Sequence, residues 1–274
     1  MTFQRKLIAA AASLALSAGA AHAQISGNVV KIGVMNDQAG TYADLAGPGS
    51  TLAARMAVED FKAKEKGLTV EVVFADHQNK PDVGSQIVRK WYDSEGVDVV
   101  VDVPTSSVAL AVNQITKDKN KVFLVSGAAT ADLTGKACTP NTVSFTYDTY
   151  MLANGTGKAL TKAGGDTWFF LTVDYAFGHA LERDTSAAVT SSGGKVVGQV
   201  RHPLNTSDFS SFLLQAQSSK SKVIGLANAG GDATNSIKQA AEFGIVAGGQ
   251  KIAPLLMFIN DVHALGLRTA QGLT

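Results

Sequence analysis

The sequence VVKIGVMNDQAGTYADLAGPGSTLAARMAVED, residues 29–60, carries the pattern that decides the fold. It begins between Val29 and Val34 with an apolar, β-branched run that is typical of a buried parallel strand. A polar loop follows at 36–41, and a helix-start signal at 46–50 precedes an amphipathic run. A strand, a loop and a helix form the first half of a βαβ unit. We therefore expect an open α/β sheet whose ligand site lies beyond the carboxyl ends of its strands.

Length and charge exclude some classes of protein. The chain has 274 residues, of which 45% are hydrophobic and 17% charged, and its net charge is +1. This length allows one large domain or two smaller ones, each able to bury a core. Because charges of both signs are interspersed and form no basic stripe, nucleic acid is not expected as a partner.

Residues 1–23 are predicted to be a secretory signal peptide. Arg5 and Lys6 form a positive region, residues 7–18 are apolar, and the Ala-His-Ala sequence at 21–23 fits a cleavage site. The alternative is a membrane anchor, but a membrane-spanning helix needs about 20 apolar residues and this run is shorter. We therefore expect the mature chain to be secreted.

Apolar runs and amphipathic runs alternate along the rest of the chain, which predicts parallel sheets with right-handed crossovers. The alternation is interrupted by an irregular connection at 133–141 and resumes after Tyr147. We therefore predict an N-terminal lobe over residues 24–147 and a C-terminal lobe over residues 148–274. Near the end of the chain the pattern predicts a strand at 252–259 and a helix at 262–267.

The sequence carries no enzyme motif that we recognise. It has no G-x-S-x-G elbow and no Walker A sequence, and His77, His179, His202 and His263 lack the H-x-x-x-H spacing of a metal site. The single cysteine, Cys138, allows no intramolecular disulfide, and we expect it to pack as a small apolar side chain. We therefore expect no catalysis, no metal and no cofactor.

Polar loops rich in hydroxyl groups and glycine follow one predicted strand after another, at 36–41, 105–107, 126–130, 174–178 and 228–232. Several precede a helix, whose N-terminus offers unpaired N–H groups and a partial positive charge that favour a carboxylate. For any single Ser or Thr the alternative is a helix cap. Tyrosines in these loops combine an apolar ring with a hydroxyl group, as a pocket for a small amphipathic ligand requires.

Several segments, taken in order, resemble one protein family. The set is similar to the periplasmic binding proteins of branched-chain amino acid ABC transporters, which are leucine-binding-protein-like, type I solute-binding proteins. The segments are VKIGVMNDQAG (30–40), VEDFKA (58–63), DHQNKPD (76–82), VSGAATADLTGKAC (125–138), YDTYMLANG (147–155) and DYAFG (174–178).

This resemblance implies an α/β fold of two Rossmann-like lobes with parallel sheets, joined by a hinge, that close on a ligand and dock on a membrane permease. Chains of that family continue beyond the second lobe and re-enter the first. We therefore expect a C-terminally truncated chain with an incomplete N-terminal lobe.

The resemblance also places the family's ligand contacts on this sequence. Most of these contacts come from hydroxyl groups before the third helix, the loop after the fourth strand, the hinge and the aromatic lid. The loop tyrosines add to the set. We expect the ligand to be bound by Tyr42, Thr105, Ser106, Ser107, Ala128, Ala129, Thr130, Tyr147, Tyr150, Tyr175, Phe177, Ala229, Gly230, Asp232 and Phe258.

One departure from the family pattern bears on the ligand. Amino-acid binders of the family place an acid after the strand near Leu256, where it pairs with the ligand's ammonium group. Here the nearest match is Phe258 or Ile259, although a shift of two residues would bring in Asp261. A buried ammonium without a counter-charge is costly. An aromatic or oxo acid is therefore favoured slightly over leucine, isoleucine or valine.

These observations predict a monomeric, periplasmic solute-binding protein of an ABC importer. An extracytoplasmic ligand-sensing domain of the same fold is one alternative, and a secreted α/β enzyme is another. Turnover of the ligand by purified protein would identify the enzyme, and a membrane helix in the same protein would favour the sensor.

Overall fold

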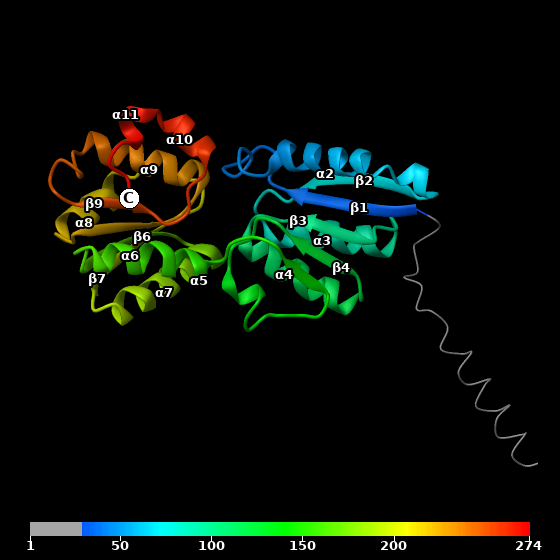
Figure 1. Ribbon diagram of the computed structural model, residues 1–274, viewed down its shortest axis with the longest axis horizontal. Coiled ribbons are helices and arrows are strands. Elements are labelled where there is room, and N and C mark those ends of the chain that lie inside the picture. The colour runs from blue at the N-terminus through cyan, green and yellow to red at the C-terminus, as the bar shows by residue number, and fades with distance from the viewer. Residues whose placement is uncertain (1–28) are drawn as a thin grey trace, which may run out of the picture.

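The computed structural model describes residues 29–274, which form two α/β lobes placed side by side (Figure 1). Each lobe is a parallel sheet flanked by helices, as the alternating pattern predicts. The predicted signal peptide lies outside the described residues. Within the described part, no helix is both long and apolar enough to cross a membrane.

The N-terminal lobe contains a five-stranded sheet in the order β2-β1-β3-β4-β5. The strands are β1 (Val29–Asn36), β2 (Thr69–Asp76), β3 (Val99–Asp102), β4 (Val122–Val125) and β5 (Thr142–Ser144). The helices are α2 (Gly47–Phe61), α3 (Pro81–Asp93) and α4 (Ser106–Asp118), with 3₁₀ turns η2 (Ala63–Lys66) and η3 (Ala131–Leu133). Helices α3 and α4 pack on one face of the sheet around Met35, Val100 and Phe123, and α2 lies on the opposite face (Figure 1).

The C-terminal lobe contains a four-stranded sheet in the order β7-β6-β8-β9. The strands are β6 (Thr167–Val173), β7 (Lys195–His202), β8 (Val223–Ala227) and β9 (Lys251–Pro254). The helices are α5 (Thr149–Leu152), α6 (Lys158–Lys162), α7 (Ala176–Ser191), α8 (Ser210–Ser218), α9 (Gly230–Glu242), α10 (Ile259–Leu265) and α11 (Leu267–Ala270), and a π-helical turn, η4 (Ala153–Gly157), joins α5 to α6. Helices cover both faces of this sheet, so strands β6 and β8 are almost wholly buried.

Both sheets reverse their winding at the same place in their strand order. The chain builds outward to β2 and then returns past β1 to β3, and likewise outward to β7 and back past β6 to β8. Such a switch point leaves a crevice at the carboxyl ends of the two central strands, where ligands of open α/β sheets bind. The loops that leave β1, β3, β6 and β8 therefore define the expected position of a site.

Three local predictions were wrong. Strand β9 ends at Pro254 rather than at residue 259, and the last predicted helix begins earlier, at Ile259. Gly266, with φ +73°, ends that helix. Cys138 is exposed rather than packed, because it lies in the irregular connection before β5.

Candidate ligand-binding site

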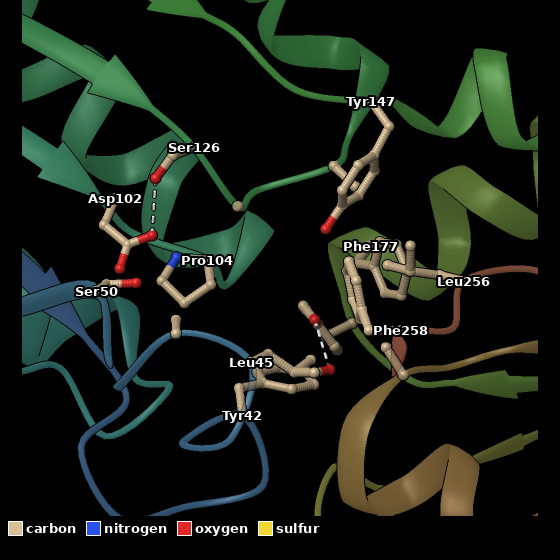
Figure 2. A pocket seen from close by; sticks show the side chains of 15 residues that line it. Tyr42, Leu45, Ser50, Asp102, Pro104, Ser126, Tyr147, Phe177, Leu256 and Phe258 are labelled. Carbon is tan, nitrogen blue, oxygen red and sulfur yellow. Dashed lines mark hydrogen bonds between the residues drawn. The ribbon is translucent and has the colours of Figure 1, made fainter. Parts of the chain in front are cut away.

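A cavity of about 270 Å³ lies between the two lobes, at the loops named above (Figure 2). It is bounded by loop residues of the N-terminal lobe, by the hinge residue Tyr147 and by aromatic residues of the C-terminal lobe. The lining residues are Tyr42, Leu45, Ala46, Ser50, Asp102, Pro104, Ser126, Gly127, Ala129, Tyr147, Tyr175, Phe177, Ala229, Leu256 and Phe258.

The N-terminal lobe contributes a polar wall that contains a carboxylate. Asp102 is the last residue of β3, and Ser126 follows β4 directly. Ser126 Oγ donates a hydrogen bond to Asp102 Oδ1 (2.9 Å), and Asn36 Nδ2 donates to Asp102 Oδ2 (2.9 Å). Figure 2 shows this pair apart from the aromatic side chains of the other lobe. One end of the cavity is therefore polar and the other is apolar.

Aromatic side chains form the opposite wall. The Tyr147 and Phe258 rings lie 5.7 Å apart between centroids, and Tyr175 and Phe177 lie 6.1 Å apart. Burial, together with the charge of Asp102, raises the pKa of Tyr147 to about 12. Burial also raises the pKa of Tyr175 and of Tyr42 far above the usual tyrosine value. These hydroxyl groups are therefore neutral. The Tyr147 hydroxyl group can donate a hydrogen bond to a ligand, whereas one of the Tyr42 and Tyr175 hydroxyl groups donates to the other.

Four helices begin at the edge of the cavity. Helix α2 starts after Ala46, α4 after Pro104 and Thr105, α7 after Tyr175, and α9 after Ala229. In none of the four does the N-cap side chain accept a hydrogen bond from the helix. The first N–H groups of a helix have no partner within it, and they carry a partial positive charge. This arrangement can stabilise an anion held in the cavity.

The lobes touch each other beside the cavity, so this is a closed arrangement. The hydroxyl groups of Tyr42 and Tyr175 are 2.8 Å apart, and the Gly231 amide donates to the Thr41 carbonyl oxygen (3.2 Å). A Cβ at Gly230, where φ is +58°, would approach the same carbonyl oxygen to 2.6 Å, so a side chain would separate the lobes. Nearer the hinge, Arg183 pairs with Asp132 (3.3 Å).

Seven of the fifteen predicted site residues line the cavity: Tyr42, Ala129, Tyr147, Tyr175, Phe177, Ala229 and Phe258. The other eight lie outside its lining: Thr105, Ser106, Ser107, Ala128, Thr130, Tyr150, Gly230 and Asp232. Most of the second group follow a strand in the loops that reach the site, but they are not part of the cavity lining.

Three of the residues outside the lining, Thr105, Ser106 and Thr130, use their hydroxyl groups in hydrogen bonds within the N-terminal lobe. Thr105 donates to the side-chain oxygen of Asn79, and Ser106 Oγ accepts from the Thr130 amide (3.3 Å). Thr130 Oγ1 accepts in turn from the Asp132 amide (3.3 Å). These contacts are the capping and loop-bracing roles that sequence reasoning treats as the alternative for a single Ser or Thr.

Two further predicted residues have other surroundings. Tyr150 is 65% exposed on α5. Asp232 is buried in the first turn of α9, where its carboxyl group accepts hydrogen bonds from the Asn205 amide (3.1 Å) and the Thr206 amide (2.9 Å). Burial raises the pKa of Asp232 to about 6, although both hydrogen bonds act to lower it. In this structure Asp232 joins α9 to the loop after β7.

Sequence reasoning missed eight lining residues: Leu45, Ala46, Ser50, Asp102, Pro104, Ser126, Gly127 and Leu256. Asp102 and Ser126 could have been found, since each lies at the carboxyl end of a predicted strand near the switch point. Asp261, the acid considered near Leu256, caps α10 by accepting from the Phe258 amide (2.8 Å) and does not line the cavity. Within residues 29–274, no cluster of His, Cys, Asp and Glu is arranged to hold a metal ion.

Comparisons with known proteins agree with this architecture. A family model described as periplasmic binding protein matches residues 29–274. A crystal structure of a periplasmic binding protein from Burkholderia mallei is 56% identical, with a TM-score of 0.87, over 90% of this chain and 65% of that one. A Leu/Ile/Val-binding protein homolog from Brucella melitensis is 28% identical over 94% of this chain and 66% of its own length.

A more distant structure shares the fold. An ABC transporter solute-binding protein from R. palustris, in complex with benzoate, has a TM-score of 0.79 at 24% identity, over 89% of this chain and 67% of that one. The chain thus spans about two thirds of the length of the relatives named here. On the family model and the two-lobed fold, the chain belongs to the periplasmic binding protein family, as a leucine-binding-protein-like, type I member.

Proposed function

We propose that this protein is a periplasmic solute-binding protein of an ABC importer and that it captures a small carboxylate ligand in the cavity between its lobes. The observation that carries the proposal is the convergence of four uncapped helix N-termini, those of α2, α4, α7 and α9, on one closed cavity. No Lys, Arg or His side chain is among the described residues that line it. The dipoles of these helices and neutral hydroxyl groups therefore supply the attraction for an anion.

The size and walls of the cavity suit a small ligand with an apolar body. Its volume of about 270 Å³ lies near the lower end of the range of small-molecule sites, which is roughly 300–1,000 Å³. Tyr147, Phe177 and Phe258 offer ring faces to the apolar part, while the polar wall of the N-terminal lobe receives the head group.

Closure is the mechanism that fits this arrangement. A ligand that touches both lobes binds the closed form better than the open form, and so shifts the population toward closure. The Tyr42–Tyr175 contact and the Thr41–Gly231 hydrogen bond exist only when the lobes meet. In the proposed cycle the closed monomer, exported to the periplasm, delivers its ligand to a permease of the inner membrane.

The sequence ranks aromatic or oxo acids slightly above branched-chain amino acids because Phe258 stands where an acid was expected. The names of the relatives point both ways, since one refers to Leu/Ile/Val and another structure holds benzoate. Phe258 lines the cavity, which supports the view that no acid occupies this position of the site. An acid from the other lobe, Asp102, also lines the cavity and changes the ranking of ligands.

Calorimetry with the purified full chain tests the function, using leucine, benzoate and related acids as ligands. We expect saturable one-site binding, no chemical change in the recovered ligand, and at least about tenfold weaker binding by Phe177→Ala, equivalent to about 1.4 kcal/mol. Phe212→Ala is the matched control, because Phe212 packs in the C-terminal lobe but does not line the cavity. Binding that is unchanged in Phe177→Ala would contradict the site, and turnover of the ligand would favour an enzyme.

A further inference from the structure

Asp102 is the one charged side chain among the described residues that line the cavity. It is only 3% exposed, so its carboxylate faces the enclosed space rather than bulk water. A carboxylate is an unexpected neighbour for an anionic ligand, because like charges close together in a site of low dielectric constant repel strongly. Its presence calls for a group on the ligand that it can bind.

The carboxylate of Asp102 is held in place but keeps capacity to accept more hydrogen bonds. Oδ1 accepts from Ser126 and Oδ2 accepts from Asn36, one bond to each oxygen. An ionised carboxylate has about four acceptor positions, so about two remain. Asn36 also donates to the carbonyl oxygen of Gly47 (3.0 Å), which fixes the orientation of its amide. Asp102 is therefore a preorganised acceptor.

The backbone at Asp102 has an unusual conformation. Asp102 has φ +80° and Val103 has φ +55°, two consecutive non-glycine residues in a region that side chains disfavour. Such conformations are energetically costly and persist where the surroundings enforce them, often at functional sites. Here the Val103 amide donates to the Met35 carbonyl oxygen (2.8 Å), which anchors this turn to β1.

This turn sets Asp102 close to the uncapped start of α4. Only Val103, Pro104 and Thr105 separate Asp102 from the first residue of that helix, and Pro104 also lines the cavity. A ligand carboxylate that approaches the start of α4 from the cavity, at Pro104, would therefore lie in the same part of the cavity as the Asp102 carboxylate. A ligand that carries an N–H or O–H donor on the adjacent carbon would turn this repulsion into a hydrogen bond or ion pair.

We infer that Asp102 is a specificity-determining residue, which selects acids that bear a donor next to the carboxylate over acids that lack one. The ligand class is therefore an α-amino or α-hydroxy acid with an apolar body, and simple aromatic acids and oxo acids bind less well. This inference rests on the proposed function. It assigns Asp102 the counter-charge that the sequence does not supply at Phe258.

Ligand sets that share one apolar body test the inference on the full chain. Leucine and 2-hydroxy-4-methylpentanoate carry the donor, whereas 4-methylpentanoate and 4-methyl-2-oxopentanoate lack it. Phenylglycine and mandelate, compared with phenylacetate and phenylglyoxylate, repeat the test on an aromatic body. We expect calorimetry to show that the better donor-bearing acid of the preferred set binds at least about tenfold more tightly than both donor-free acids. The relative affinities of the amino acid and the hydroxy acid then distinguish an ion pair from a hydrogen bond with a neutral donor.

Asp102→Asn removes the charge while keeping the shape of the side chain. We expect the donor-bearing acids to bind at least about tenfold more weakly to this variant and the donor-free acids to bind equally or more tightly. Ser126→Ala is the comparison variant, because it removes one hydrogen bond to Asp102 but leaves the carboxylate. It should retain the preference for donor-bearing acids.

Three results would overturn the inference. The wild-type protein could bind donor-free acids as tightly as their partners, or Asp102→Asn could weaken all members by the same factor, as a purely structural residue would. If Asp102→Asn does not fold, the ranking of acids by the wild-type protein decides alone. If no acid of either set binds the wild-type protein, the proposed function fails as well, whereas binding without a donor preference defeats only the role of Asp102.

Discussion

The two lobes share a strand order but differ in how their sheets are covered. The C-terminal sheet has a hydrophobic core on each face, one around Trp168 and Phe170 and the other around Phe169 and Leu171. The N-terminal sheet has one such core, beneath α3 and α4. On its other face α2 lies at β1 and β2, and apolar side chains further along the sheet are exposed, among them Val122, Val143 and Phe145.

This difference matters because parallel sheets are normally buried on both faces. The paired residues Val101, Leu124 and Val143 continue one apolar row across β3, β4 and β5, and the row ends at a side chain that is 48% exposed. A contiguous exposed apolar patch of this kind marks a contact surface or a weakness. The C-terminal lobe is therefore expected to be the more stable half of the described chain.

The largest effect is expected from a matched pair of phenylalanines. Phe170→Ala, in the buried strand β6, should lower the free energy of unfolding by about 3–5 kcal/mol, because it leaves a cavity in a core. Phe145→Ala removes a side chain that is 66% exposed, and should change it by less than about 0.5 kcal/mol. Urea unfolding measures both. A cost of several kcal/mol for Phe145→Ala would mean that the exposed face is covered in solution.

The second prediction contrasts one buried titratable group from each lobe. Burial lowers the pKa of His77 in the N-terminal lobe to about 4, so between pH 6.5 and 4 the unfolded chain binds more protons there. Its contribution to stability is present above pH 6.5 and is lost on acidification, by about 2 kcal/mol at pH 5. Burial raises the pKa of Asp232 in the C-terminal lobe to about 6. Between pH 6 and the lower pKa that Asp232 has in the unfolded chain, the folded chain binds more protons at this carboxyl group. The contribution of Asp232 to the free energy of unfolding therefore rises on acidification.

Variants isolate these opposite slopes from the other titrating groups. Between pH 7 and 5, wild type should lose about 2 kcal/mol of stability relative to His77→Asn and gain about 1 kcal/mol relative to Asp232→Asn. Urea unfolding at a series of pH values provides the measurement. His202, whose pKa burial also lowers, is present in all three proteins and cancels in the comparison. Slopes of the same sign would refute the contrast between these two sites.

The smallest effect concerns the contact between the lobes. Tyr175→Phe removes the hydroxyl group that meets Tyr42, which should destabilise the closed form by about 1 kcal/mol and weaken ligand binding about fivefold. Tyr150→Phe is the control, because the Tyr150 side chain is exposed and lies outside the cavity lining. Equal affinities for Tyr175→Phe and wild type in calorimetry would show that this contact does not contribute to closure.

The strands and helices that were predicted well are those that a local sequence pattern determines. The β-branched run of β1, the helix-start signal of α2 and the continuous apolar run of β6 each reflect interactions between residues near in sequence. Predictions were poorer where a proline or glycine ends an element, as at β9 and α10. Of the aromatic residues predicted in strand-end loops, Tyr42, Tyr147, Tyr175 and Phe177 line the cavity, whereas Tyr150 is exposed. Ser106, Thr130 and Asp232 show that the same loops also supply side chains for bracing.

The sequence by itself determined the alternation of strands and helices, the division into two lobes and the family to which the chain belongs. Only the tertiary structure decided which strand-end loops meet, because strand order and lobe closure bring together residues more than a hundred positions apart, such as Tyr42 and Tyr175. It also decided that Asp102 faces the cavity while Asp232 and Asp261 cap backbone amides. Periodicity reports which face of an element is apolar, whereas the direction of a polar side chain depends on partners that are distant in sequence.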